Sequence, residues 1–152
     1  QIMAGTFTKQ SIHAIFATKD RQKLILPKYE LELFSYIAGI LKQQNCAPIS
    51  VGGYLDHVHV LFHLSSTLSL SAVMEHLKTH SSKFAKGMGP EMKNFYWQFG
   101  FGAFSVNPKE TQKVVEYIRN QKVHHKTRTF QEEFIRFLNS YEIEFDEKYI
   151  WR

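Results

Sequence analysis

Residues 57–62, which read His-Val-His-Val-Leu-Phe, restrict the possible folds more than any other segment of this chain. Their almost unbroken apolar content is typical of a strand that is buried within a sheet. Residues two apart on a strand project from the same face, so His57 and His59 should lie side by side with their backbones about 6–7 Å apart. We therefore expect a buried strand that holds two imidazoles rigidly on one face.

The rest of the chain alternates between strand-like and helix-like patterns. The expected strands cover residues 11–18, 48–54, the His57 run, 95–98 and 102–106. The expected helices cover about 27–44, 69–86, 109–125 and 130–139. This order predicts an α+β, ferredoxin-like or RRM-like split βαβ fold, with a central antiparallel sheet and helices on one face. We expect the His57 strand at the centre of the sheet, and the other face open to a polynucleotide.

Composition indicates one folded domain with a polyanionic partner. The 152 residues are 43% hydrophobic, which predicts a single domain over residues 1–152, with residues from about 130 to 152 as an appendage. Lysine and arginine number 19 against 14 acidic residues, and the net charge of +5 favours nucleic acid as a partner. The single cysteine, Cys46, excludes an intramolecular disulfide and favours the cytoplasm. No apolar run approaches the ~20 residues of a membrane span, so no membrane partner is expected.

A second pair of residues complements the two histidines. Tyr117 and Gln121 are four apart in the predicted helix over 109–125, so they share one face of it. Two neutral imidazoles and an amide oxygen can bind a divalent cation and leave coordination positions open, while a nearby phenol can act as a nucleophile. The combination predicts metal-assisted attack by a tyrosine on a phosphate. The alternative is that the histidines serve packing or hydrogen bonding, that Tyr117 is a core aromatic residue of an amphipathic helix, and that Gln121 is a solvated amide.

Other polar residues have two interpretations each. A set of basic and hydroxylated residues either contacts phosphates or forms an ordinary solvated surface. The set comprises Lys19, Arg21, Lys78, Ser81, Ser82 and Lys83. Asp56 either orients a metal-bound imidazole or caps the turn next to it. His124 and His125 either face the metal or DNA, or lie in solvent at the C-terminus of a helix.

Motifs spread along nearly the whole chain indicate a family. They include Gly-Gly-Tyr-Leu-Asp-His-Val-His and Tyr-Ile-Arg-Asn-Gln-Lys-Val-His-His, and they cover residues 16–21, 52–59, 77–82, 97–106 and 117–125. With these motifs the chain resembles the single-tyrosine HUH transposases of small bacterial and archaeal insertion sequences, which include the REP-associated tyrosine transposases.

The resemblance implies a DNA transposase that cuts and rejoins single-stranded DNA at hairpin-bearing element ends. In this family His57, His59 and Gln121 would bind Mg²⁺ or Mn²⁺, and Tyr117 would form a 5′-phosphotyrosine intermediate. The family also implies a homodimer in which the tyrosine helix completes the partner's site in trans. The short link over residues 105–108 agrees, because it leaves little chain for the helix to fold back over its own histidines. The alternative is a non-enzymatic or domesticated module that binds single-stranded nucleic acid.

Overall fold

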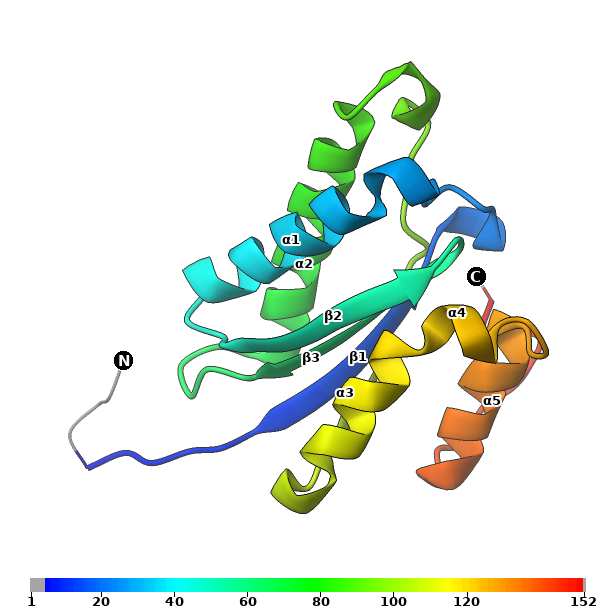
Figure 1. The fold of residues 1–152 in the computed structure, drawn as a ribbon. Coiled ribbons are helices and arrows are strands. Elements are labelled where there is room, and N and C mark those ends of the chain that lie inside the picture. The colour runs from blue at the N-terminus through cyan, green and yellow to red at the C-terminus, as the bar shows by residue number, and fades with distance from the viewer. Residues whose placement is uncertain (1–4, 152) are drawn as a thin grey trace.

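A four-stranded antiparallel sheet with helices on both faces forms the protein in a computed structural model, which describes residues 5–151 (Figure 1). The strands are β1 (Ser11–Ala17), β2 (Pro48–Tyr54), β3 (His57–His63) and β4 (Gly102–Ser105). The α-helices are α1 (Pro27–Gln43), α2 (Leu70–Lys86), α3 (Thr111–Arg119), α4 (Gln121–His124) and α5 (Phe130–Ser140). Short 3-10 helices lie at Lys19–Arg21, Pro90–Met92 and Pro108–Glu110.

The sheet places β3 in its interior. The strand order is β2-β3-β1-β4, and β1 pairs antiparallel with both β3 and β4. At one end of the β1–β3 ladder Ala17 lies opposite His57, and two residues further along Ile15 lies opposite His59. The expected split βαβ fold and the central position of the histidine strand are therefore confirmed, and β2 pairs antiparallel with β3.

Helices α1 and α2 cover one face of the sheet, where they bury the main apolar core. Alternate residues of β1 and β3, such as Phe16 and Val60, are fully or almost fully buried against Leu33 and Ile37 of α1 and Leu77 of α2. Both helices begin at residues that favour a helix start. Helix α1 has Pro27 in its first turn, and at the start of α2 the Ser69 side chain accepts a hydrogen bond from the Ala72 amide.

The opposite face is covered as well, so the expectation of an open face was wrong. On this face Ile15 and Ala17 pack with Phe104, α5 and the C-terminal segment, while Leu61 packs with Ile118 of α3. An apolar surface of this kind is stabilised when it is removed from water, which explains why helices α3 to α5 lie over it (Figure 1). The segment after residue 130 thus lies against the sheet.

Two predicted elements differ in the structure. Residues 95–98 form no strand; only an isolated bridge joins Trp97 to Thr18. The helix expected over 109–125 is interrupted at Asn120, where φ is −96° and ψ is 22°, because asparagine is a weak helix former that favours helix ends. Within residues 5–151, no helix has both the length and the apolar content to cross a membrane.

Candidate active site

Two buried histidines of β3 form the base of the candidate site. His57 and His59 have no exposed surface, and their ring centroids lie 5.2 Å apart. Both project toward the face that α3, α4 and α5 cover, because residues two apart on a strand share a face. The predicted side-by-side arrangement is therefore confirmed, in a buried setting.

The Nδ1 atom of each histidine is held by another group, which directs Nε2 to a common centre. His57 Nδ1 lies 2.7 Å from Asp56 Oδ1, so Asp56 orients this imidazole. His59 Nδ1 lies 2.8 Å from His13 Nε2. A third ring, that of His125 at the end of α4, has its Nδ1 2.7 Å from the Arg128 carbonyl oxygen. Contacts of this kind fix the orientation and tautomer of metal-binding imidazoles.

Gln121 joins the histidines, as its position on the sequence predicted. Its Oε1 lies 2.8 Å from His57 Nε2 and 3.0 Å from His125 Nε2. Its amide nitrogen donates hydrogen bonds to the Tyr117 carbonyl at 3.4 Å and to Glu133 Oε2 at 3.2 Å. The amide group is therefore oriented with its oxygen toward the imidazoles.

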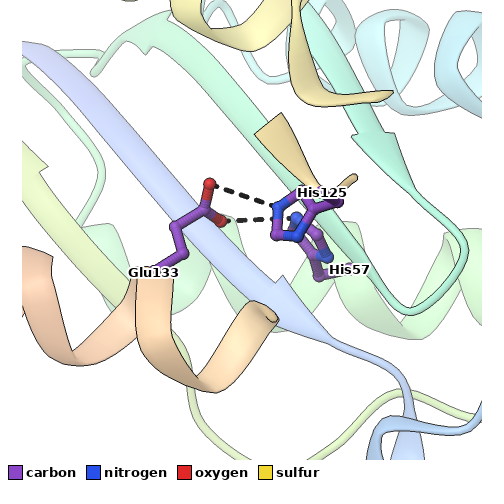
Figure 2. Close-up of side chains that lie close together, drawn as sticks. All are labelled: His57, His125 and Glu133. Atoms are coloured by element: carbon purple, nitrogen blue, oxygen red, sulfur yellow. Dashed lines mark ion pairs between the residues drawn. The ribbon is translucent and has the colours of Figure 1, made fainter. Parts of the chain in front are cut away.

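Glu133 of α5 also belongs to the site, and the sequence reasoning missed it. Its carboxylate is 1% exposed and lies among three imidazoles, with Oε1 2.9 Å from His59 Nε2. Figure 2 shows the other two contacts, in which Oε1 lies 3.4 Å from His57 Nε2 and Oε2 lies 3.3 Å from His125 Nε2. A signal was present in the sequence, because Glu133 interrupts the apolar stripe of α5 between Phe130 and Phe137.

Tyr117 lies at the same cluster within one chain. Its hydroxyl donates a hydrogen bond to Glu133 Oε2, and its ring lies 5.7 Å from that of His59 and stacks on that of His124 at 4.6 Å. The link before α3 turns sharply, with the Asn107 side chain accepting a hydrogen bond from the Lys109 amide. This link therefore lets the helix reach its own histidines, and our expectation that it is too short was wrong.

The pKa values of the cluster follow from burial and from these contacts. Burial lowers the pKa of His57, but hydrogen bonds to Asp56 and Glu133 outweigh it and raise this pKa to about 9. Burial raises the pKa of Glu133, but hydrogen bonds from His125, His57 and His59 hold it well below its ordinary value. Burial lowers the pKa of His59, whereas burial and the Glu133 carboxylate raise that of Tyr117. The site thus holds an anionic carboxylate, a protonated His57 and a protonated phenol.

The hydrogen-bond chemistry of the cluster fits a cation at its centre. A carbonyl oxygen accepts only, so His125 Nδ1 donates to Arg128, while His125 Nε2 faces Gln121 Oε1 and Glu133 Oε2. Acceptors that face one another need a positive charge between them, which a proton on an imidazole or a metal ion supplies. His57, His125 and Glu133 offer ligand atoms within 4.8 Å of one another. The donor set suits a divalent metal ion.

A cleft opens beside the tyrosine. It has a volume of about 300 Å³ and is lined by Tyr117, Arg128, Glu133, Arg136, Phe137 and Ser140. Two arginines thus line the cleft together with Tyr117, where an incoming phosphate would need positive charge.

The residues expected to contact DNA separate into two groups. Ser81 is fully buried and accepts a hydrogen bond from Trp97 Nε1 at 2.9 Å, and Lys78 Nζ donates to the Gln98 and Gly100 carbonyls at 2.5 and 2.6 Å. Ser82 is half-buried, and its hydroxyl accepts a hydrogen bond from Lys86 Nζ at 2.8 Å. Ser82 Oγ also donates to the Phe95 carbonyl at 3.5 Å. All three residues therefore contact the loop over residues 95–100, which packs on α2 where we expected solvent or DNA.

The other three candidate residues, which are all basic, remain available to a ligand. Lys19 and Lys83 are exposed, and the half-buried Arg21 donates to the Trp151 carbonyl at 3.1 Å and lies over the Trp151 ring. They stay candidate phosphate contacts.

Comparison with known protein sequences relates the chain to one group of transposases. A family model described as IS200-like transposases matches residues 6–121. Proteins named as the transposase for insertion sequence element IS200, from Salmonella typhimurium and Salmonella typhi, are each 25% identical over 124 residues. The match covers 78% of this chain and 81% of each relative.

Solved structures share the fold. A proposed transposase from Deinococcus radiodurans R1 superimposes with a TM-score of 0.60 at 20% identity, over 80% of this chain and 97% of the other. A REP-associated tyrosine transposase bound to a REP hairpin gives a TM-score of 0.58 at 18% identity, over 82% and 74% of the two chains. Both structures support the conclusion that the four-stranded sheet and its helices form the fold that these transposases share.

Proposed function

Because the chain belongs to the family of IS200-like transposases, we propose that it cuts and rejoins single-stranded DNA through a covalent 5′-phosphotyrosine intermediate on Tyr117. The observation that carries this proposal is the position of the Tyr117 hydroxyl at a buried cluster of two histidines, Gln121 and Glu133. A phenol whose hydroxyl donates to a buried carboxylate has a proton acceptor beside it, which a tyrosine nucleophile needs and a core aromatic residue does not.

His57, His59 and Gln121 would hold a Mg²⁺ or Mn²⁺ ion, and the bound ion would stabilise negative charge on the scissile phosphate. Tyr117 Oη would attack the phosphorus in line, forming the phosphotyrosine bond while the bond to the 3′ oxygen breaks. The phenol proton would leave by way of the Glu133 carboxylate that accepts its hydrogen bond and pass on to water. The departing 3′ oxygen would take up one proton from water, so the products are the phosphotyrosine and a 3′-hydroxyl. Rejoining reverses these steps with a 3′-hydroxyl as the nucleophile.

We propose a single strand as the substrate. Tyr117, Arg128 and Arg136 line a cleft of about 300 Å³, which a flexible strand enters more easily than a stiff duplex that must first be unpaired. Lys19, Arg21 and Lys83 would contact phosphates further along the strand. Since the REP-associated relative was solved with a REP hairpin, we propose hairpin-bearing ends as the DNA recognised here.

We also propose a homodimer. Within one chain Tyr117 reaches its own His59, so a dimer with sites completed in trans would exchange α3 between two protomers and keep the same contacts. Mixing a His57→Ala/His59→Ala protein with a Tyr117→Phe protein tests this exchange. Recovery of cleavage in the mixture supports sites in trans, and no recovery after proven subunit exchange contradicts them.

Incubation with labelled single-stranded oligonucleotides tests the activity itself. We expect nicking that depends on a divalent metal, together with a protein–DNA adduct that survives a denaturing gel. DNA binding without nicking or adduct, at any divalent metal supplied, would instead support a non-enzymatic binding module.

A further inference from the structure

We propose that Glu133 of α5 is an anionic ligand of the divalent metal ion, in addition to His57, His59 and Gln121. This inference rests on the proposed metal-dependent function and extends it to a residue outside the matched family region. The family model ends at residue 121, whereas Glu133 lies on a separate helix after a loop. Nothing in residues 6–121 supplies a carboxylate at this position.

The distances from Glu133 Oε1 to the two imidazole nitrogens of β3 agree with the spacing of ligands around one ion. Metal–ligand bonds to nitrogen and oxygen are about 2.0–2.2 Å long, so neighbouring ligand atoms lie about 3.0 Å apart around an octahedral ion and about 3.4 Å apart around a tetrahedral one. In this structure His59 Nε2 and His57 Nε2 lie 2.9 and 3.4 Å from Glu133 Oε1. His57 Nε2 and Gln121 Oε1 lie 2.8 Å apart. Glu133 Oε1 therefore lies at ligand spacing from both imidazole nitrogens of β3.

The charge of Glu133 gives a second, independent argument. A buried carboxylate is costly unless a cation or several donors compensate it. Among the described residues, all ion-pair partners of Glu133 are histidines, and no lysine or arginine pairs with it. A divalent ion at the centre would supply positive charge next to this carboxylate in place of the proton on His57.

The same carboxylate also connects the metal site to the nucleophile. Oε1 faces the β3 imidazoles, while Oε2 accepts the hydrogen bond from the Tyr117 hydroxyl. Glu133 would therefore hold the phenol next to the ion. A carboxylate further makes the site harder, which favours Mn²⁺ and Mg²⁺ over Zn²⁺ compared with a site of imidazoles and an amide alone.

Calorimetric titration of the full chain with Mn²⁺ and with Zn²⁺, in the absence of DNA, tests the inference. The variants are Glu133→Gln, which removes the charge but keeps the shape, and Glu132→Gln as the matched control. Glu132 is exposed on the same helix, and glutamine fits its capping-box position equally well. We expect Glu133→Gln to weaken Mn²⁺ binding at least ~10-fold and Zn²⁺ binding by a smaller factor, with wild-type values in the control.

The two metals separate a ligand from a merely structural residue. General loosening of the cluster would weaken Mn²⁺ and Zn²⁺ binding alike, so an equal loss for both ions overturns the inference. Mn²⁺ binding by Glu133→Gln with wild-type affinity also overturns it, while leaving the proposed function intact if the wild type still forms the adduct. If circular dichroism shows that Glu133→Gln is unfolded, Glu133→Asp takes its place, because aspartate keeps the negative charge. We expect Glu133→Asp to lose less of its affinity for Mn²⁺ than of its affinity for Zn²⁺. Equal losses for both ions contradict the inference there too.

Discussion

Gly52 of β2 holds the helix that carries Tyr117 close to the sheet, and its replacement by alanine should disturb the site from a distance. A Cβ atom at position 52 would lie 2.9 Å from both Cγ2 and the carbonyl oxygen of Ile118. Ordinary contacts begin at 3.4 Å, so α3 must move away by about 0.5 Å. Ile118 is the neighbour of Tyr117 in α3, so the same movement displaces the nucleophile.

The magnitudes follow from this displacement. Overpacking of a well-packed contact costs about 1–3 kcal/mol of unfolding free energy. A 1 Å misplacement of a reacting group reduces the rate on the order of 100-fold, so half of that distance should slow adduct formation about 10-fold. Urea unfolding and single-turnover adduct formation on a labelled single strand measure the two effects.

Gly39→Ala is the matched control for this substitution. Gly39 lies within α1, and a Cβ atom there meets nothing within 4 Å. Alanine in a helix should stabilise the protein by about 0.5–1 kcal/mol and leave the rate unchanged. If Gly52→Ala forms the adduct as fast as the Gly39→Ala control, the contact between Gly52 and Ile118 does not position Tyr117, and the reasoning is refuted.

Three further predictions concern the nucleophile, the charge of His57 and the DNA substrate. Tyr117→Phe removes only the hydroxyl, so it should abolish the adduct on a denaturing gel while Mn²⁺ affinity, measured by calorimetry, stays within a few-fold of wild type; an adduct with this variant would identify another nucleophile. The folded pKa of His57, about 9, lies above its ordinary value of 6.5, so its stabilisation is complete below pH 6.5 and is lost as the pH rises through 9. The unfolding free energy of the metal-free protein should therefore fall by about 2–3 kcal/mol between pH 6.5 and 10, and by less in Asp56→Asn, whereas a flat profile in the wild type would contradict the ion-paired His57. Single-stranded DNA should bind more tightly than a blunt duplex in a fluorescence anisotropy titration, with affinity that falls steeply as salt rises, and equal affinity at moderate salt would count against a single-strand substrate.

Local patterns were sufficient to predict the fold and much of the site. The period-two pattern of β3 placed His57 and His59 on one face, and the spacing of four brought Gln121 and Tyr117 to the same cluster. These predictions succeeded because they depend on backbone geometry within one or two elements.

Packing between distant segments decided the remainder. Whether Glu133 faces solvent or the histidines depends on how α5 lies on the sheet, which its own sequence signals only through an acidic residue on an apolar stripe. Lys78 and Ser81 illustrate the same limit, because a lysine and a serine that suit a phosphate equally suit the carbonyls and the indole of a loop that packs on α2. The covered second face also follows from contacts between distant elements, since apolar residues alone do not specify which helix buries them.

The most direct test of the account is the identity of the residue that becomes linked to DNA. After reaction with a single-stranded oligonucleotide and Mn²⁺, trypsin should release residues 114–119, Val-Val-Glu-Tyr-Ile-Arg, because it cleaves after Lys113 and after Arg119. The account predicts that mass spectrometry finds a nucleotide attached through a 5′-phosphate to Tyr117 in this peptide, and that the His57→Ala/His59→Ala protein lacks it. A nucleotide on a different tyrosine, or no linked peptide in the wild-type protein with Mn²⁺ present, would contradict the account.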